Sequence, residues 1–364
     1  MKIVMLLGRS TGGIASHVAE LSSDLRDCGV DVLVVTHPLT AQRFDLGPVR
    51  LWWPGSAGRA RALRDLRRFR RLVSTSDVVH AHGLRAGALA VLAVRSLPRE
   101  RRPRVVVTLH NVPVGGPAVR TVSAGLERVV ARGADVVLGV SGDLVERARA
   151  LGASQTARAL VPAPVRPPTR RTTAQVRESL GVQDGAALLV TVARLAAQKG
   201  LDTLCDTSAL LKDRMDAGDL PEITGLIWVV AGEGPLEAYL DRRIETDALP
   251  VVALGRRDDV PDLLAAADLV ISTAVWEGQP LWLQEAMQLG AAIVATDVGG
   301  TSEVTGVGAS LVPGGDPPHL SGRVVDLLTD RSRRLALGEA ALERARELPT
   351  IADVVAQLMG VYSG

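Results

Sequence analysis

Short apolar runs alternate along this chain with segments of helical periodicity, and this alternation constrains its fold more than any other feature. The runs are rich in Val, Leu and Ile and nearly uninterrupted, as is typical of strands buried on both faces of a parallel sheet. Strands that alternate with helices form βαβ units. The sequence therefore predicts an α/β protein with two doubly wound parallel sheets, whose ligands bind at the carboxyl ends of the strands. The predicted strands are residues 3–7, 32–36, 78–81, 105–109 and 136–140, then 188–193, 226–231, 251–254, 269–273, 292–295 and 309–312.

A proline-rich segment, residues 160–168, divides the predicted strands into two sets. Proline cannot continue a helix, so this segment is expected to be a stiff, extended hinge. The length of 364 residues also suits two domains better than a single core. We expect an N-terminal domain over residues 1–162, a hinge and the start of the second domain over 163–185, a C-terminal domain over 186–340 and a final helical segment over 341–364.

Composition excludes several classes of protein. The net charge of +2 and the aromatic content of 2% provide neither the electric field nor the stacking platforms with which proteins bind nucleic acid. Cys28 and Cys205 are isolated, without the spacing of a disulfide framework or a metal site. No apolar run reaches the roughly 18 residues of a membrane span, and the first run is too short for a signal peptide. We expect a cytoplasmic protein, and the bias toward Ala and Arg is typical of bacterial sequences.

Residues 276–287, with the sequence Trp-Glu-Gly-Gln-Pro-Leu-Trp-Leu-Gln-Glu-Ala-Met, predict an anion site. They follow a predicted strand, and Pro280 suits the first position of a helix. A helix that starts after a glycine-containing loop offers free N–H groups and the positive end of its dipole to a phosphate. Because Pro280 has no N–H, the contacts fall to the amides of Gln279, Leu281 or a neighbour in this loop, which also contains Gly278.

Two carboxylates flank this predicted phosphate site. Glu277 lies in the loop before the helix, and Glu285 lies about 7 Å further along at 1.5 Å per residue. A carboxylate cannot bind phosphate, but it accepts hydrogen bonds from hydroxyl groups. The arrangement suits a ligand with hydroxyls, a diphosphate and further hydroxyls in series, which is the chemistry of a nucleotide sugar. The alternative is a helix whose first turns carry acidic residues that complement its dipole.

Glu277 and Glu285, on a strand, loop and helix with Gly278 and Pro280 between them, resemble the E-x7-E motif of retaining glycosyltransferases of the GT-B fold, the large family-four type. Residues 292–300, Ala-Ile-Val-Ala-Thr-Asp-Val-Gly-Gly, are similar to that family as well. The resemblance implies two Rossmann-like domains, an interdomain cleft and a last helix that crosses back to the N-terminal domain. It also implies transfer of a hexose, with retention, from a UDP- or GDP-linked sugar to an acceptor hydroxyl. One departure is that many relatives have Gly-Phe-Gly where this chain has Gly-Gln-Pro.

Two cations, Arg194 and Lys199, straddle the predicted turn from the strand at 188–193 into a helix. Arginine offers a bidentate fork and lysine a point charge, so the two can hold a diphosphate from both sides. They resemble the Arg and Lys pair with which family-four enzymes neutralise the leaving diphosphate. The alternative is a pair of solvated surface cations.

Three further segments are similar to parts of the family's donor site. Gly12 and Gly13 resemble the Gly-Gly loop that faces the donor phosphates and the acceptor, although a tight turn that needs glycine explains Gly12 equally well. Gly232 and Glu233 follow a predicted strand and are expected to line the pocket. Arg256 lies in a segment similar to the one whose backbone contacts the nucleotide base, so side chains do not reveal which base is bound.

Histidines follow two of the predicted strands. His110 matches the active-site histidine of the family, which bonds the donor sugar or lies near the reaction centre. His80 and His82 are expected to be structural. A His-x-His pattern is also compatible with a metal site, but the sequence shows no third ligand with suitable spacing. No Asp-x-Asp motif lies at a strand end. We expect no metal and no cofactor, with the nucleotide diphosphate sugar as substrate.

The segment from Arg59 to Leu72 predicts a basic amphipathic helix, with Leu63, Leu66 and Phe69 at helical spacing and arginines at most other positions. Such a helix can lie on a membrane with anionic lipids, or it can pack its apolar stripe on the sheet and leave the arginines in solvent. Similar helices of the phosphatidylinositol mannosyltransferases in this family dock on membranes. A peripheral location on the inner face of the plasma membrane therefore stays open, and a second basic run, residues 95–104, is a candidate for the same surface.

These observations predict a hexosyltransferase whose acceptor is a cell-envelope glycolipid, a polysaccharide or a secondary metabolite. One alternative is a GT-B epimerase that acts on nucleotide amino sugars without an acceptor. Another is a non-catalytic protein that binds a nucleotide sugar, and the intact candidate residues count against it. A nicotinamide dehydrogenase is disfavoured, because the loop after the first strand lacks G-x-G-x-x-G.

Overall fold

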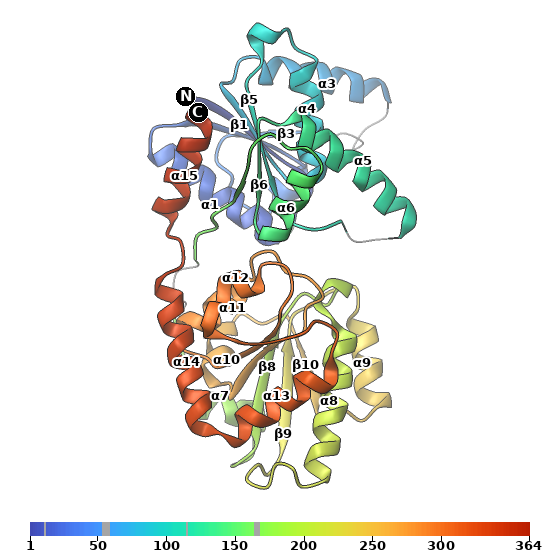
Figure 1. Cartoon of the computed structure of the whole chain (residues 1–364), viewed down its shortest axis with the longest axis vertical. Coiled ribbons are helices and arrows are strands. Elements are labelled where there is room, and N and C mark those ends of the chain that lie inside the picture. The colour runs from blue at the N-terminus through green and yellow to red at the C-terminus, as the bar shows by residue number, and fades with distance from the viewer. Residues whose placement is uncertain (11, 53–58, 114–115, 164–167) are drawn as a thin grey trace. The chain divides into compact units, whose positions relative to one another are not determined.

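The chain forms two compact units (Figure 1). Unit 1 comprises Met1–Pro162 and Pro349–Gly364, and unit 2 comprises Ala163–Leu348. The structure is a computed structural model that describes residues 1–10, 12–52, 59–113, 116–163 and 168–364, without the side chains of residues 59–65. Part of the predicted proline hinge, residues 164–167, lies outside the described residues.

Unit 1 is built on a parallel sheet of seven strands. The strands are β1 (Lys2–Leu7), β2 (Asp31–Thr36), β3 (Val49–Leu51), β4 (Val78–His82), β5 (Arg104–Leu109), β6 (Val136–Gly139) and β7 (Thr156–Arg158). They lie in the order β3-β2-β1-β4-β5-β6-β7. The sequence did not predict β3 and β7. Each is three residues long, lies at an edge of the sheet and is half-buried or exposed, so neither carries an apolar run.

Helices lie on both sides of this sheet (Figure 1). They are α1 (Gly13–Asp27), α2 (Pro38–Ala41), α3 (Arg59–Val73), α4 (Leu84–Arg95), η1 (Arg99–Arg101), α5 (Pro117–Gly133), α6 (Gly142–Ala150) and α15 (Ile351–Ser363). The last of them, α15, contacts α1 and β5. Gln357 of α15 donates from Nε2 to the carbonyl of Arg158 (2.8 Å) and accepts at Oε1 from the amide of Leu160 (2.9 Å). The C-terminal helix therefore belongs to the same compact unit as the N-terminal sheet.

Unit 2 is built on a parallel sheet of six strands. The strands are β8 (Ala187–Val192), β9 (Leu226–Ala231), β10 (Val251–Gly255), β11 (Leu269–Ser272), β12 (Ile293–Thr296) and β13 (Ser310–Val312). They lie in the order β10-β9-β8-β11-β12-β13, and all of them were predicted. The helices are α7 (Thr173–Ser179), η2 (Ala197–Lys199), α8 (Leu201–Asp216), α9 (Glu237–Thr246), α10 (Val260–Ala266), α11 (Leu281–Gln288), α12 (Thr301–Thr305), η3 (Gly306–Gly308), α13 (Pro317–Thr329) and α14 (Arg331–Arg346).

The tail contains a break between α14 and α15, where the sequence predicted one helical segment over residues 341–364. Pro349 lies in this break, and proline cannot continue a helix. Thr350 then caps α15 in a capping box, in which its side chain accepts from the amide of Asp353 and the Asp353 carboxylate accepts from the amide of Thr350. Both local signals favour a new helix rather than a continuous one.

Each sheet reverses its winding direction at one point. In unit 1 the reversal lies between β1 and β4, and in unit 2 it lies between β8 and β11. The loops that leave neighbouring strands at such a point diverge, and the crevice between them is where doubly wound folds bind ligands. The loops after β1, β8 and β11 carry Gly12, Arg194 and Glu277, so the topology selects several of the loops that the sequence motifs selected. His110, Gly232 and Arg256 follow the neighbouring strands β5, β9 and β10.

The basic helix α3 packs part of its apolar stripe inward. Phe69 is 3% exposed, and its ring stacks on that of Trp52 with centroids 4.9 Å apart. This supports the interpretation as a surface helix, although Leu66 is 40% exposed beside exposed arginines. Arg70 donates from Nη2 to the carbonyl of Ser96 (2.8 Å), which joins α3 to the second basic run. Within the described part of the chain, no helix is both long and apolar enough to cross a bilayer.

Candidate active site

Hydrogen bonds join the loop after β8 to the loop after β11, where the sheet of unit 2 reverses its winding direction. The loop after β11 donates from the amide of Val275 to the carbonyl of Gln198 (2.9 Å), and the Gln198 side chain donates from Nε2 to the carbonyl of Trp276 (2.9 Å). Thr273 donates from Oγ1 to the carbonyl of Lys199 (2.9 Å). These bonds fix the loop after β8 against the loop after β11, and so they fix the candidate residues that both loops carry.

Lys199 and Glu277 are in direct contact. Lys199 Nζ pairs with Glu277 Oε1, and the two side chains are 20% and 7% exposed. A carboxylate this far from solvent needs a charged or hydrogen-bonding partner. The sequence assigned Lys199 to a diphosphate and Glu277 to sugar hydroxyls, and the structure brings the two together as one ion pair. Lysine carries three donors, so the pair leaves Lys199 able to bind a further acceptor.

Glycines allow these loops to approach one another closely. Gly299 has φ +55°, and a Cβ there would lie 2.0 Å from the carbonyl oxygen of Glu277. The next amide, that of Gly300, donates to the same oxygen (2.8 Å). Gly232, at the end of β9, has a hypothetical Cβ 1.9 Å from the carbonyl oxygen of Ala193. The family-like glycine turns are therefore needed by the backbone packing of the site.

The N-terminus of α11 lies directly after Glu277 and its loop. Pro280 is the N-cap, with a non-helical ψ of 84°, and Leu281 is the first helical residue. The expectation that Pro280 opens the helix was wrong by one position, because its backbone has not yet turned helical. Among the described residues no side chain caps this helix, and the first amides of a helix lack intrahelical acceptors. The amides of Leu283 and Gln284 donate to the carbonyl of Pro280 (3.0 and 3.2 Å), so among the described residues the amides of Leu281 and Trp282 are the ones available to an anion.

The remaining candidates of unit 2 differ in their surroundings. Glu285, in the second turn of α11, is half-buried, and burial raises the pKa of its carboxyl. Arg194, after β8, is exposed and has no carboxylate partner in the described residues. Glu233 is exposed, and its carbonyl accepts from the amide of Leu195 (3.0 Å), which ties the loop after β9 to the loop after β8. The structure thus groups the loops after β8, β9, β11 and β12 at the carboxyl ends of these strands.

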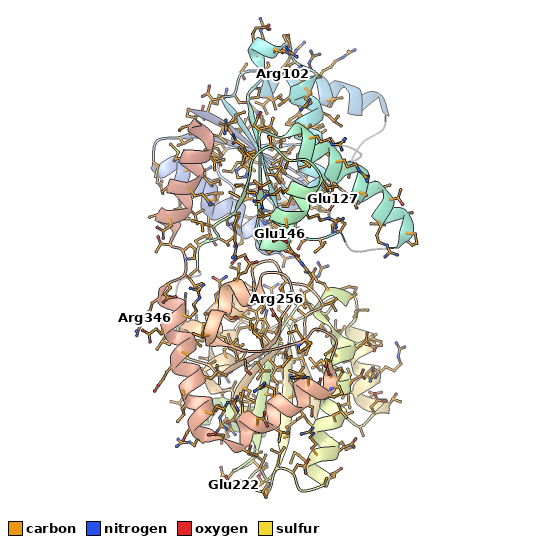
Figure 2. All side chains as sticks on the ribbon, in the orientation of Figure 1. Arg102, Glu127, Glu146, Glu222, Arg256 and Arg346 are labelled. Carbon is orange, nitrogen blue, oxygen red and sulfur yellow. The ribbon has the colours of Figure 1, made fainter. Side chains whose placement is uncertain are left out.

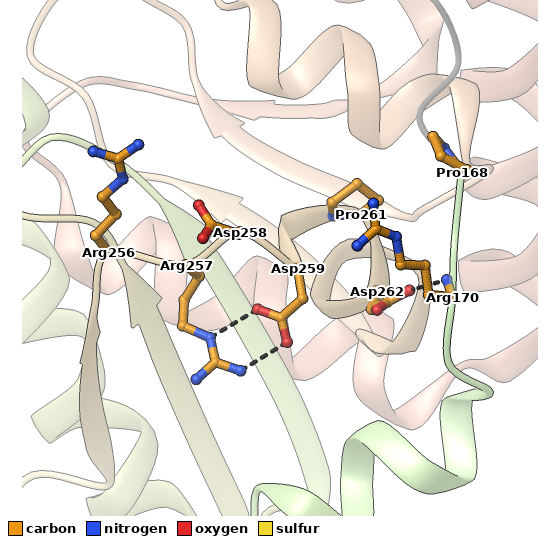
Figure 3. Close-up of a pocket in the computed structure, with 8 residues that line it drawn as sticks. All are labelled: Pro168, Arg170, Arg256, Arg257, Asp258, Asp259, Pro261 and Asp262. Atoms are coloured by element: carbon orange, nitrogen blue, oxygen red, sulfur yellow. Dashed lines mark hydrogen bonds and ion pairs between the residues drawn. The ribbon is translucent and has the colours of Figure 1, made fainter.

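Arg256 lines a cavity of about 460 Å³ beside the end of β10, and most residues of its lining are charged (Figure 3). Its neighbour Arg257 forms a bidentate pair with Asp259 (2.8 and 2.7 Å), which lowers the pKa of that carboxyl. The amide of Arg170 donates to Asp262 Oδ1 (2.7 Å) on the other side of the cavity. Arg256 is exposed and takes no part in these pairs, as Figure 3 shows.

Unit 1 has a cluster of histidines at the carboxyl ends of β4 and β5. His82 Nδ1 and His110 Nε2 are 3.1 Å apart, and the ring of His17 from α1 lies 6.0 and 5.9 Å from those two rings. Burial lowers the pKa of His17 to about 4 and holds the pKa of His82 and His110 well below the usual value. All three rings are therefore neutral at pH 7. The pairing of His82 with His110 has no signal in the sequence, because the two residues are remote in the chain.

The hydrogen bonds of the cluster indicate which nitrogens carry protons. His82 Nε2 is buried and has no hydrogen-bond partner among the residues that the structure describes. A buried N–H without an acceptor is rarer than a buried lone pair without a donor, so the proton of His82 belongs on Nδ1, where it donates to His110 Nε2. His110 then carries its own proton on Nδ1. His110 is thus a hydrogen-bond donor toward a ligand rather than a base.

His80 differs from His82 and His110, because both of its ring nitrogens are bonded. Nδ1 lies 2.7 Å from the hydroxyl of Tyr362 in α15, and Nε2 lies 2.8 Å from Thr108 Oγ1. This fits the structural role expected for His80. Among the residues that the structure describes, no three His, Cys, Asp or Glu side chains are grouped as metal ligands.

The Gly-Gly turn of unit 1 begins α1. Gly12 is the N-cap, with φ −138°, and Gly13 is the first helical residue, while Thr11 lies outside the described residues. Any residue can adopt the extended backbone conformation of Gly12, and a Cβ there would meet nothing within 4 Å. The alternative of a turn that requires glycine does not hold for Gly12. Because Gly12 has no side chain, the space at the N-terminus of α1 stays open.

Comparison with known proteins gives the same family for both units. The family model "Glycosyl transferase 4-like domain" matches residues 12–164, and the model "Glycosyl transferases group 1" matches residues 186–330. N-acetyl-alpha-D-glucosaminyl L-malate synthase of Bacillus anthracis is 25% identical over 302 residues, which are 79% of this chain and 74% of that protein. D-inositol 3-phosphate glycosyltransferase of Kribbella flavida is 27% identical over 374 residues, 92% of this chain and 87% of that protein. Other curated relatives are matched over about half of their length.

A solved structure supports the fold. Anabaena Alr3699/HepE, crystallised in complex with UDP and glucose, is similar to this chain with a TM-score of 0.80 and 21% identity, over 100% of this chain and 99% of that one. Two Rossmann-like parallel-sheet domains in one chain are the GT-B architecture. The two matched regions together span more than half of the sequence. The chain therefore belongs to the GT-B glycosyltransferases of the family-four type and is a glycosyltransferase.

Proposed function

We propose that this enzyme transfers a hexose from a UDP- or GDP-linked sugar to an acceptor hydroxyl, with retention of the anomeric configuration. The observation that carries the proposal is the Lys199–Glu277 ion pair in front of the uncapped N-terminus of α11. A diphosphate suits the cation and the free amides. Hydroxyl groups suit the carboxylates, so a nucleotide sugar satisfies both kinds of group.

The proposed chemistry is breakage of the bond between the anomeric carbon and the diphosphate oxygen. Negative charge then grows on the diphosphate, where Arg194, Lys199 and the first amides of α11 stabilise it. Glu277, held by Lys199, orients hydroxyls of the sugar, and Glu285 holds the ribose. The acceptor oxygen bonds to the anomeric carbon on the face that the diphosphate leaves, and the leaving phosphate takes the acceptor's proton. Fixed cations supply the positive charge in this proposal, so we expect no metal requirement.

The proposal assigns the donor to unit 2 and the acceptor to unit 1. In unit 1, His110 presents an N–H donor to a ligand oxygen, and the open space around Gly12 accommodates the ligand. Names of similar proteins agree with a donor of this kind, because Alr3699/HepE was crystallised with UDP and glucose. Relatives are named for varied acceptors, including L-malate and inositol 3-phosphate. For this chain we propose a cell-envelope glycolipid, a polysaccharide or a secondary metabolite as the acceptor.

A donor screen tests the proposal. The full chain is mixed with UDP- and GDP-linked hexoses, with and without EDTA, and both its melting temperature and the release of nucleoside diphosphate are measured. We expect one donor to raise the melting temperature and to release nucleoside diphosphate in the presence of EDTA. Nuclear magnetic resonance of the product then reports the anomeric configuration. Conversion of the donor to an isomer without an acceptor indicates an epimerase, and binding without any turnover across an acceptor panel indicates a non-catalytic protein.

A further inference from the structure

A pocket of about 610 Å³ opens in unit 1 at the carboxyl ends of β1, β4 and β5. His82 and His110 form part of its lining, together with residues that follow β1 and residues of α4 and α5. All of the lining residues belong to unit 1. The pocket therefore shares no lining residue with the site in unit 2 that is proposed to hold the donor.

The polar part of the pocket is positively charged. Arg9 follows β1, and Arg85 lies in the first turn of α4. Both are exposed, neither has a carboxylate partner in the described residues, and no lining residue is Asp or Glu. Two guanidinium groups at a concave surface without a counterion attract an anion, and each offers a fork that matches a phosphate or a carboxylate.

Many other lining residues of the pocket are apolar. Val119 and Val122 of α5 line it and are 44% and 64% exposed, and Leu126 lies one turn further along the same helix. Leu84, Val112 and Pro113 are further apolar residues of the lining. Apolar side chains left exposed inside a pocket indicate that the ligand covers them. An anion alone satisfies only the two arginines, and an apolar molecule alone satisfies only the apolar lining residues.

We propose that this pocket binds an acceptor in which a phosphate or carboxylate, held by Arg9 and Arg85, is attached to an apolar group that packs on α5. The inference rests on the proposed function, because it gives the chemical class of the acceptor. His110 lies in the same pocket and offers an N–H to a hydroxyl of such a molecule. The buried His82 Nε2, which has no partner in the described residues, is the second polar atom at this side. A phosphorylated lipid and a small hydrophobic acid share this chemistry.

Calorimetric titration of the full chain without donor tests the proposal with hexyl phosphate, hexan-1-ol and inorganic phosphate as probes. We expect hexyl phosphate to bind at least about tenfold more tightly than either other probe, because only it engages both the arginines and the apolar lining residues. Arg9→Gln and Arg85→Gln should each weaken hexyl phosphate by about tenfold. Val122→Ser should weaken hexyl phosphate and leave inorganic phosphate unchanged.

The matched control is Arg99→Gln. Arg99 is an exposed arginine of unit 1 in η1, in the segment that also carries Arg102 (Figure 2), ahead of the amino end of β5. Equal binding of hexyl phosphate by the control and by Arg9→Gln/Arg85→Gln, with unchanged melting temperatures, would overturn the proposal. Equal binding of hexan-1-ol and hexyl phosphate would overturn it as well. The titration contains no donor, so its result does not depend on the release of nucleoside diphosphate. That release is the separate test of the proposed function.

A series of alkyl phosphates distinguishes the two sources of the ligand. Affinity that keeps rising from hexyl to decyl phosphate supports a phosphorylated lipid, since each buried CH₂ adds about 0.8 kcal/mol, or roughly fourfold. Affinity that stops rising at hexyl phosphate supports a small acid that fits within the pocket. Loss of binding as the chain lengthens from ethyl to hexyl phosphate would contradict the role of the apolar lining residues and the proposal with it.

Discussion

Lys199 and Glu277 form an ion pair that joins the loop after β8 to the loop after β11. The two residues were expected to act on different parts of one ligand. Their contact means that the charge of Lys199 is shared between Glu277 and whatever anion binds beside it. It also means that either residue, if changed alone, leaves the other as a poorly solvated charge.

The first prediction concerns this pair. Lys199→Met and Glu277→Gln should each destabilise unit 2 by about 1–3 kcal/mol, because each leaves one partly buried charge unpaired. The double variant should lose less than the sum, by about 0.5–3 kcal/mol. Melting temperatures measure this, with Glu347→Gln as the control, since the Arg344–Glu347 pair has a carboxylate that is 63% exposed and should contribute less than about 1 kcal/mol. Strictly additive losses would show that the pair is not coupled.

The second prediction concerns Gly299. Gly299→Ala should lower turnover by about 100-fold, because a Cβ displaces the Glu277 backbone and small misplacements of this size are costly. Gly181→Ala is the control: its φ of +68° gives the same backbone strain, but nothing lies within 4 Å of its Cβ. Both should lose about 1 kcal/mol of stability from the left-handed backbone. Equal turnover in the two variants would mean that Gly299 does not position Glu277.

The third prediction is acid destabilisation of unit 1. The folded-state pKa of His17 is about 4, below the ordinary value of 6.5, and burial lowers that of His80 and His82 as well. The unfolded state therefore binds more protons between pH 6.5 and 4, so stability is constant above about pH 7 and falls as the pH drops through this window. The slope is about 1.4 kcal/mol per pH unit for each buried histidine.

Melting temperatures between pH 7.5 and 4.5 measure that slope. His17→Leu removes one of the neutral buried rings and should make the fall shallower. His319→Gln changes an exposed histidine of unit 2 and should leave the slope as it is in the unaltered chain. A slope that is the same for both variants contradicts the burial of the cluster.

The fourth prediction concerns the proton of His110. Nitrogen-15 spectra should show His110 protonated on Nδ1 at pH 7, because His82 donates to its Nε2. The chain has six histidines, so the spectrum is simple to assign. His82→Leu removes the donor and should shift the His110 signals, whereas Tyr362→Phe should shift those of His80 and leave His110 unchanged. Protonation of His110 on Nε2 would refute the inferred tautomer.

The fifth prediction concerns the basic helix α3. Arg67, Arg68 and Arg71 are exposed on it, and changing all three to Glu should weaken binding to vesicles with anionic lipid by at least about 100-fold, at about 1 kcal/mol per arginine. Arg70 is left unaltered because it bonds to Ser96. Co-sedimentation with vesicles measures the effect, with Arg331→Glu/Arg333→Glu on α14 of unit 2 as the control. Equal sedimentation of both variants would argue for a purely structural helix.

The strands of both sheets were predictable because buried parallel strands have continuous apolar sequences. β3 and β7 were not, since three half-buried or exposed residues at an edge leave no such signal. The start of α11 was predicted to within one residue, because Pro280 can occupy either the cap or the first turn. Local sequence thus carries the elements that are long or buried on both faces.

The long-range contacts of the site were beyond sequence reasoning. The pairing of Lys199 with Glu277 depends on β8 and β11 being neighbours, which the chain order does not reveal. The bond between His80 and Tyr362 depends on α15 returning to unit 1. Neither residue pair has a local signature, so the motifs named the residues of the candidate site but not the bonds among them.

The position of a bound nucleoside diphosphate tests the central claim most directly. A crystal structure of the enzyme with UDP or GDP, whichever raises its melting temperature, should place a phosphate oxygen within hydrogen-bonding distance of the Leu281 amide. The same diphosphate should contact Arg194 or Lys199, and the ribose hydroxyls should contact Glu285. A diphosphate held away from the N-terminus of α11, with those side chains untouched, would contradict the account.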